Sequence, residues 1–79
     1  MQDEKINKIL GELIRETRQQ KGMKQTDLAD SMGIDFQVLS AYERGKRNPG
    51  LIWLFKLCDC LDVDFKDFMG QLNEKRLDA

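Results

Sequence analysis

The side chains that most often carry out chemistry in proteins are scarce in this sequence. It contains no histidine, the commonest metal ligand and general base. Its two cysteines, Cys58 and Cys60, are two residues apart in an expected helix, so their side chains point roughly 200° away from each other and cannot bridge within the chain. No nucleophile and base pair, metal cluster or phosphate-binding glycine loop is visible. We expect two reduced, packed thiols, with metal or redox chemistry as the weaker alternative, and no cofactor or enzymatic activity.

A different group of residues could bind anions. Three cations and an amide side chain follow one another closely, and the glycines and proline around them predict a loop: Arg44, Lys46, Arg47 and Asn48. Such a cluster is also typical of a merely solvated loop. The 13 Lys and Arg of the chain are balanced by 14 Asp and Glu, so the whole molecule is not a basic polyanion binder. Any contact with phosphates must come from a local patch.

Length and composition indicate one small globular domain. With 79 residues, 41% apolar and 34% charged, the chain is too short for a two-domain enzyme with a cleft between the domains. Residues 1–58 carry ten Lys or Arg against eight Asp or Glu, whereas residues 59–79 carry three against six. No apolar run approaches the roughly 20 residues of a membrane span, and the first residues do not form a secretion signal. We expect a cytoplasmic protein without membrane contact.

Apolar spacing and helix-ending residues predict five helices and no strands. The first runs from Ile6 to Gly22. The second has barely two turns and ends at Gly33. Asp35 can cap the third, which ends at Gly45.

The last two helices are the most apolar. The fourth starts at Leu51, and five of its residues are expected on one side: Leu51, Leu54, Phe55, Cys58 and Leu61. The fifth starts near Asp64, which can cap it, and four of its residues have the spacing of one helix face: Phe65, Phe68, Met69 and Leu72. We expect a single domain over residues 1–79, with its core in 6–69 and a short acidic C-terminal extension in 70–79.

The most informative spacing lies between residues 25 and 42. Two helices joined steeply by a short turn need a small residue where they cross, a glycine at the turn, and apolar residues behind the second helix. Ala29 and Gly33 meet the first two needs. Ile34, Leu39 and Tyr42 meet the third. This is a helix-turn-helix pattern.

The match extends well beyond that pattern, over these residues: Ile14-Arg15, Arg18, Lys21-Gly22, Gln25, Leu28-Ala29, Gly33-Ile34, Leu39-Ser40, Tyr42 to Pro49 and Leu54 to Leu57. In them the chain resembles the phage repressor and Cro type of helix-turn-helix family, often called the Xre type. The resemblance implies an all-α, compact five-helix, lambda-repressor-like DNA-binding domain with the helix-turn-helix at its second and third helices. It also implies a homodimer on a palindromic operator in double-stranded DNA, and regulation of transcription, which we expect to be repression.

The outward side of the third helix is predicted to read DNA bases. On a helical wheel, four of its residues point away from the core: Phe36, Gln37, Ser40 and Ala41. Gln37 can bond the N6 and N7 edge of adenine, and Ser40 can reach a base or a phosphate. Phe36 or Ala41 can touch a thymine methyl group. The alternative is an ordinary solvated surface.

Phosphate contacts are predicted for residues around the two helices: Gln25, Lys24, Arg15, Arg44, Lys46, Arg47 and Asn48. Gln25 lies at the start of the second helix, whose free N–H groups also attract phosphate. Lys24 stands where the family usually has a serine or threonine cap. Arg18 and Glu43 align with positions that pair in the family, and we expect them to fix the angle between the first and third helices more than to add stability.

The last two helices have more apolar residues than one small core needs. The predicted dimer interface contains Ile52, Trp53, Phe55, Phe65, Phe68, Met69 and Leu72. For Trp53 the alternative is folding back onto the first or fifth helix of its own chain. Relatives usually have polar residues at positions 52 and 53. This difference and the acidic segment after Asp59 leave a second function open, a protein-interaction module such as an antitoxin that binds a protein partner.

Overall fold

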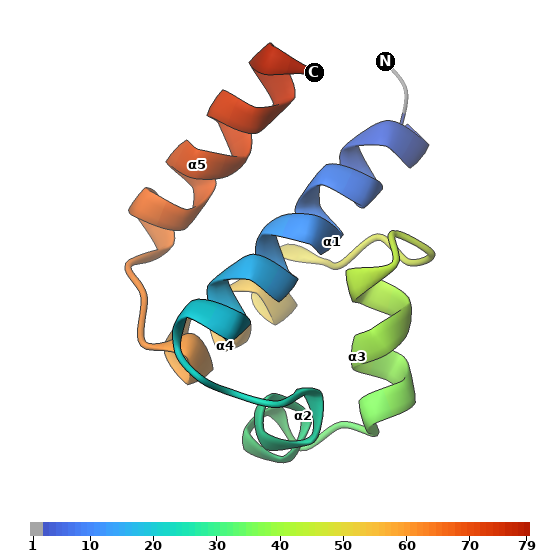
Figure 1. The fold of residues 1–79 in the computed structure, drawn as a ribbon, viewed down its shortest axis with the longest axis vertical. Helices are drawn as coiled ribbons and strands as arrows, with labels where there is room; N and C mark the ends of the chain where they lie inside the picture. Colours follow the sequence, from blue (N-terminus) through green and yellow to red (C-terminus); the bar gives the residue numbers. More distant parts are fainter. Residues whose placement is uncertain (1–2) are drawn as a thin grey trace.

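The computed structural model describes residues 3–79, which form five helices (Figure 1). They are α1 (Asp3–Gln20), α2 (Gln25–Met32), α3 (Phe36–Glu43), α4 (Leu51–Leu61) and α5 (Phe65–Asp78). Residues 3–79 contain no strand, so the predicted all-α, five-helix architecture is confirmed. The expected domain of 1–79 also includes Met1 and Gln2, which lie outside the described residues. In the described part, no helix combines the length and apolar character needed to cross a membrane.

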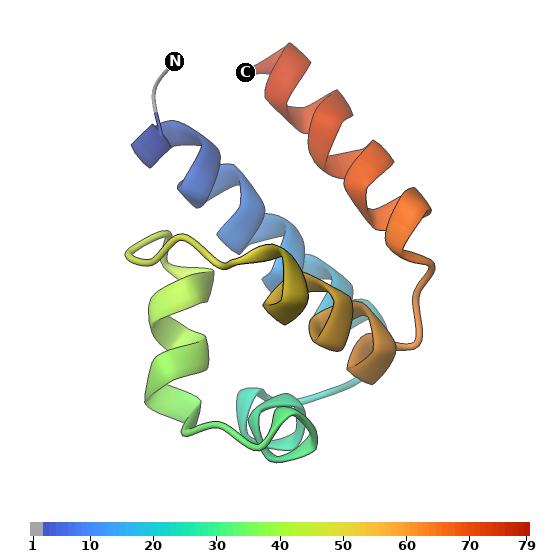
Figure 2. The same ribbon diagram turned by 180° about the vertical axis from the view of Figure 1, so that it is seen from behind.

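The longest helix, α1, lies between α3 and α5 and packs against both. It begins at Asp3 rather than at Ile6, because acidic residues in its first turn favour a helix N-terminus. α1 and α5 run antiparallel and side by side, so the start of one lies near the end of the other (Figure 1 and Figure 2). The short α2 closes the opposite end of the molecule and packs against α3 and α4.

All five helices contribute side chains to one core. Its buried apolar residues are Leu10, Leu13, Ile14, Leu28, Ala29, Leu39, Leu54, Leu57, Cys58, Leu61 and Phe68. The helices α2 and α3 have eight residues each, which is too short for a helix to be stable in isolation. Their position therefore depends on packing against α1 and α4.

The buried side of α4 differs from the predicted one. Leu57 is fully buried, whereas Leu51 and Phe55, expected to face the core, are 60% and 46% exposed. Only Lys56 and Asp59 interrupt the apolar sequence of this helix. An almost continuously apolar helix does not indicate which of its sides is buried, and the prediction was wrong for this reason.

The predicted helix caps are present. An Asp35 carboxylate oxygen accepts a hydrogen bond from the backbone N–H of Gln37 at 2.8 Å, which confirms the cap of α3. The Asp64 carboxylate accepts one from the N–H of Lys66, also at 2.8 Å, which confirms the cap of α5. These caps satisfy N–H groups that a helix start leaves unpaired.

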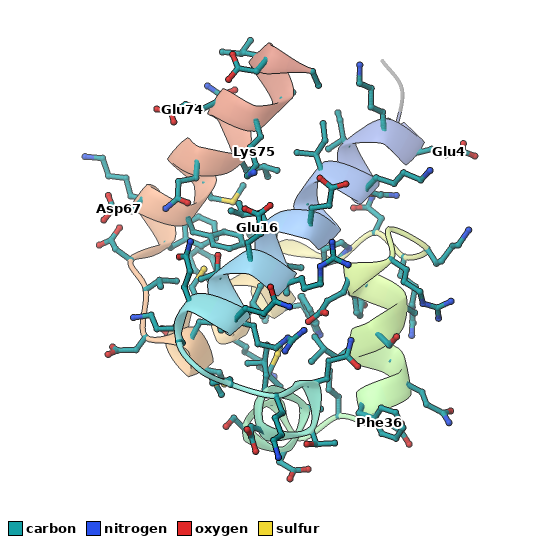
Figure 3. The ribbon with its side chains drawn as sticks, viewed as in Figure 1. Glu4, Glu16, Phe36, Asp67, Glu74 and Lys75 are labelled. Atoms are coloured by element: carbon teal, nitrogen blue, oxygen red, sulfur yellow. The ribbon has the colours of Figure 1, made fainter. Side chains whose placement is uncertain are left out.

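Nearly all of residues 70–79 continue α5 along α1. Lys75 Nζ of α5 lies 3.2 Å from Glu16 Oε1 of α1, in an ion pair between two partly exposed side chains (Figure 3). The prediction of an acidic extension was wrong, because two acidic and two basic residues balance there: Glu74, Asp78, Lys75 and Arg76. The excess negative charge lies in 59–67 instead.

Both cysteines are free, but they differ in access. Cys58 is 2% exposed in the core, and Cys60 is half-buried, with its Sγ 3.5 Å from the carbonyl oxygen of Ser31. Burial, reinforced by the charges of Asp59 and Asp64, raises the pKa of the Cys58 thiol to about 11. Because the thiolate is the reactive form, Cys58 is expected to be inert at neutral pH.

At pH 8 a thiol reagent should therefore modify Cys60 in the native protein well before Cys58. Mass spectrometry of the labelled protein measures the number and position of the adducts. A Cys60→Ser variant should take up almost no reagent when native and one equivalent in denaturant. Equal labelling rates of the two native thiols would show that Cys58 is not shielded.

Candidate nucleic-acid interface

Helices α2 and α3 are joined by a three-residue turn, residues 33–35, as the spacing predicts. Gly33 has a φ of 69°, a left-handed conformation that is strained for residues with a side chain. The N–H of Ile34 then donates to the carbonyl oxygen of Ala29 at 3.0 Å. Ala29 and Leu39 are both buried behind this turn. The turn and the packing thus set the direction in which α3 leaves α2.

The four predicted base-contacting residues of α3 are not equally accessible. Phe36 is 48% exposed in the first turn, on the outside of the molecule (Figure 3), and Gln37 beside it is also exposed. Ser40 and Ala41, about one turn later, are half-buried. The first turn of α3 therefore offers the most accessible side chains for contact with a ligand.

A buried network of polar groups joins α1 to the end of α3. Arg18 Nε lies 2.7 Å from one carboxylate oxygen of Glu43, and its Nη2 donates to the other at 3.0 Å. Arg18 also donates through Nη1 to the carbonyl oxygen of Met23 at 2.8 Å. Both charged residues are less than a tenth exposed. The structure therefore brings the predicted pair together in a two-pronged contact that fixes the end of α3 relative to α1.

Gln25 is the third side chain of this network. Its amide nitrogen donates to Glu43 at 3.0 Å, so one amide hydrogen is already engaged, and the other remains for the predicted phosphate contact. The sequence did not indicate this role, because positions 25 and 43 are related by no helical spacing. Lys24, just before it, is exposed, and its backbone N–H donates to the Asp27 carboxylate at 2.9 Å. Asp27 thus stabilises the helix start that Lys24 cannot cap.

The other predicted phosphate-binding residues are all exposed: Arg15, Arg44, Lys46, Arg47 and Asn48. Arg44 Nε donates to the carbonyl oxygen of Ser40, one turn back, at 3.3 Å. Arg47 lies over the ring of Tyr42, with its guanidinium carbon 5.2 Å from the ring centroid. The segment of residues 44–48, which contains these cations, is hereafter called the basic loop.

Trp53 takes a position that neither reading of the sequence predicted. Its ring stacks on Tyr42 of α3, with centroids 4.1 Å apart and ring planes at 28°. One face of the Trp53 ring therefore packs on α3 of its own chain, and not on α1 or α5 as the alternative expected. The side chain is half-buried, and its place in a dimer interface stays a prediction. The aromatic spacing carried no signal of this contact, because Tyr42 and Trp53 belong to different helices.

The remaining predicted dimer residues divide into exposed and internal groups. Phe68 is 1% exposed, so it belongs to the core of its own chain and its assignment to an interface was wrong. Met69 and Leu72 are half-buried and pack against that core. Ile52 is 72% exposed. The ring of Phe55 packs against that of the half-buried Phe65 of α5, with centroids 4.3 Å apart and ring planes tilted by 31°.

The exposed apolar residues of α4 are Leu51, Ile52 and Phe55, hereafter the α4 apolar surface. They lie within two turns of one helix and are each 46% exposed or more. Leu51 was expected in the core, so the sequence missed its place on this surface. Water contact with three large apolar side chains is unfavourable, and a partner that covers them would remove that cost.

Gly11 sets the distance between α1 and α3, a role that the sequence did not indicate. A Cβ at this position would overlap the carbonyl oxygen of Glu43 and lie 2.6 Å from that of Tyr42. The backbone of α1 therefore passes directly over the last turn of α3. A side chain at position 11 would push apart the helices that the Arg18–Glu43 pair joins.

We expect Gly11→Ala to lower the free energy of unfolding by about 1–3 kcal/mol, because overpacking forces the backbone to shift. Urea denaturation measures the change. The matched control is Gly70→Ala in α5, where an added Cβ meets no atom within 4 Å. That substitution should be neutral or stabilising by about 0.5–1 kcal/mol, since alanine favours the helix. Similar values for the two variants would contradict the close crossing.

Comparison with known proteins agrees with this geometry. A family model for helix-turn-helix domains matches residues 14–68. The chain is 32% identical over 69 residues to the HTH-type transcriptional regulator y4dJ of Sinorhizobium fredii, covering 87% of this chain and 90% of that protein. Other matched regulators are longer, and the chain spans 59% of one from Bacillus subtilis.

Solved structures of restriction-modification controller proteins have the same fold. C.AhdI from Aeromonas hydrophila is 34% identical, with a TM-score of 0.74 over 78% of this chain and 94% of that one. C.Esp1396I, solved as a tetramer with its natural 35 base-pair operator, is 29% identical. Its TM-score is 0.83 over 91% of this chain and 95% of that one. The chain described here belongs to the helix-turn-helix family of the Xre type.

Proposed function

We propose that this chain is a sequence-specific DNA-binding regulator of transcription in the cytoplasm. In this proposal it is a repressor that binds a palindromic operator as a homodimer. The observation that carries the proposal is the exposure of both ends of α3: its first turn holds Phe36 and Gln37, and its last turn leads into the basic loop. The operator complex of the similar controller protein C.Esp1396I supports it.

In this proposal the two groups of residues have different tasks. Gln37 reads a base edge in the major groove, because a glutamine amide can both donate to and accept from adenine. Phe36 touches a thymine methyl group, while Ser40 and Ala41 make closer contacts behind it. The basic loop and Lys24 bind phosphates on either side, which sets the register of α3 without reading sequence. Since the net charge is −1, these local cations supply the attraction to DNA.

A homodimer is part of the proposal because one α3 touches too few base pairs for specific affinity. Two copies related by a twofold axis read two half-sites about one helical turn, or roughly 34 Å, apart. The α4 apolar surface, together with Phe65, supports this state, since a second copy would cover it.

The test is the substitution Gln37→Ala. We expect it to weaken binding to the cognate operator by about 1–3 kcal/mol per half-site, because each subunit loses one two-pronged base contact. Binding to random duplex DNA should barely change. The cognate site can be selected from a random duplex library with the wild-type protein, and affinities measured by fluorescence anisotropy.

The matched control is Gln71→Ala, which truncates an exposed glutamine on α5 and should leave both affinities unchanged. If Gln37→Ala weakened binding to cognate and random DNA equally, Gln37 would not read a base. If the wild-type protein selected no sequence and bound no duplex, the proposed DNA-binding function itself would be wrong.

A protein-interaction module, such as an antitoxin, is the second candidate function. The α4 apolar surface favours it, because the same side chains that suit a second copy also suit a different protein. The acidic segment 59–67 lies on the next part of the chain and would repel DNA. A gel shift with the DNA beside its own gene, at two salt concentrations, separates the two candidates, since only the first predicts strong, salt-dependent binding.

A further inference from the structure

Three side chains from three segments form one continuous stack beside the proposed DNA-binding face. The guanidinium of Arg47, in the basic loop, lies over the ring of Tyr42 in α3 at 5.2 Å. The Tyr42 ring in turn stacks on Trp53 of α4, with centroids 4.1 Å apart. Tyr42 and Trp53 are half-buried, whereas Arg47 is exposed. The stack therefore leads from the body of the molecule to a surface cation.

This arrangement leaves the hydrogen-bonding edge of Arg47 available. A guanidinium is planar, so stacking uses its face while its N–H donors point outward along the edge. Arg47 makes none of the side-chain hydrogen bonds found within residues 3–79, whereas Arg44 Nε donates to the carbonyl oxygen of Ser40. A phosphate is the ligand that best matches such a free, planar set of donors.

Both ends of the basic loop are also held in place. A Cβ at Gly45 would lie 2.8 Å from the Lys8 Cα atom, so the loop begins in close contact with α1. Pro49 is buried, and its ring fixes its own backbone. Arg47 lies between these two points, and the Tyr42 ring restrains its side chain. An arginine that is already ordered loses less conformational entropy when it binds a phosphate.

We propose that Trp53 is a positioning residue for DNA binding: it supports the Tyr42 ring, which holds Arg47 ready for a DNA phosphate. This inference rests on the proposed DNA-binding function and adds to it a residue of α4 that need not touch DNA. It also explains a tryptophan where the sequence alone suggested a dimer contact.

The test is a double-mutant cycle between positions 53 and 47, measured as affinity for the selected operator over a range of salt concentrations. Trp53→Leu removes the stacked ring, and we expect a loss of about 5- to 25-fold in a dimer, the size of two exposed cation–π contacts. Arg47→Ala should make the log-log salt slope shallower by about 1 to 2 per dimer, because one phosphate contact is lost in each subunit. Added to Arg47→Ala, Trp53→Leu should cost less than about 2-fold, since the residue that it positions is gone.

Two controls separate positioning from general structure. Trp53→Phe keeps a ring against Tyr42 and should bind within about 2-fold of wild type. Lys66→Ala removes an exposed cation of α5, outside the proposed DNA-binding residues, and should leave the salt slope of DNA binding unchanged. Sedimentation at the assay concentration ensures that the position 53 variants have the wild-type oligomeric state, because Ile52 is adjacent.

The outcomes are distinct. An affinity loss from Trp53→Leu that disappears in the Arg47→Ala background supports the inference. A loss of the same size in both backgrounds, or no loss at all, overturns it while the DNA-binding function stands. Absence of binding by the wild-type protein overturns the proposed function and the inference together.

Discussion

Glu43→Ala is expected to lower the free energy of unfolding by about 3–5 kcal/mol, the cost of leaving a buried charge without its partner. The Arg18 side chain is 9% exposed and has two of its donors on Glu43. Gln25 would lose an acceptor as well. Small domains are stable by only several kcal/mol, so much of the protein should be unfolded at 37 °C. Thermal and urea denaturation followed by circular dichroism measure the change.

The matched control is Glu16→Ala, which removes a carboxylate from the other ion pair. Lys75 and Glu16 are 35% and 45% exposed, so water replaces the lost interaction and the change should stay within about 1 kcal/mol. A second variant, Arg18→Met with Glu43→Leu, removes both charges and should be more stable than Glu43→Ala alone. If the single and double variants were equally unstable, the cost would come from lost packing and not from an unpaired charge.

The parts of this structure that follow from the sequence are those fixed by local spacing. Asp35 and Asp64 cap helices because each lies two residues before the backbone N–H group that donates a hydrogen bond to its carboxylate. Gly33 ends α2 because glycine adopts the left-handed conformation of a helix C-cap without strain, and its φ is 69°. Such features depend on neighbours in the chain, and each residue type has one strong local preference there.

The parts that did not follow depend on contacts between distant segments. Gln25 meets Glu43, and Tyr42 meets Trp53, only after all the helices have packed. Gly11 looks like any glycine in a helix until α3 crosses it. The side chains of α4 are almost all apolar, so the side of the helix that is buried depends on which of them fill the core best. These are the contacts that position the proposed interface.

Ile52→Asp is expected to convert a homodimer into a folded monomer that has lost operator binding. The side chain is 72% exposed in the single chain, so an aspartate there is fully hydrated and should not disturb folding. In a dimer that covers the α4 apolar surface, the same carboxylate would be buried without a partner. The dimer alone should therefore be destabilised.

The loss of DNA binding follows from the geometry of two half-sites. Once one α3 of a dimer is bound, the second is held near its own half-site at a high effective concentration. Separating the two copies removes this advantage, which is worth about 10²- to 10⁴-fold in affinity. The monomer keeps Gln37 and the basic loop, so weak binding to random DNA should persist. Specific binding should therefore fall far more than non-specific binding.

Sedimentation velocity at tens of micromolar protein, with circular dichroism as a check on folding, measures the first part of this result. The matched control is Leu77→Asp, which places the same charge on a leucine that is 66% exposed in the last turns of α5, away from the α4 apolar surface. It should remain dimeric and bind the operator. A monomeric wild type would overturn the proposed homodimer, and an Ile52→Asp protein that stays dimeric would place the contact between copies elsewhere. If the two aspartates lowered operator affinity equally, added negative charge and not the lost dimer would explain the effect.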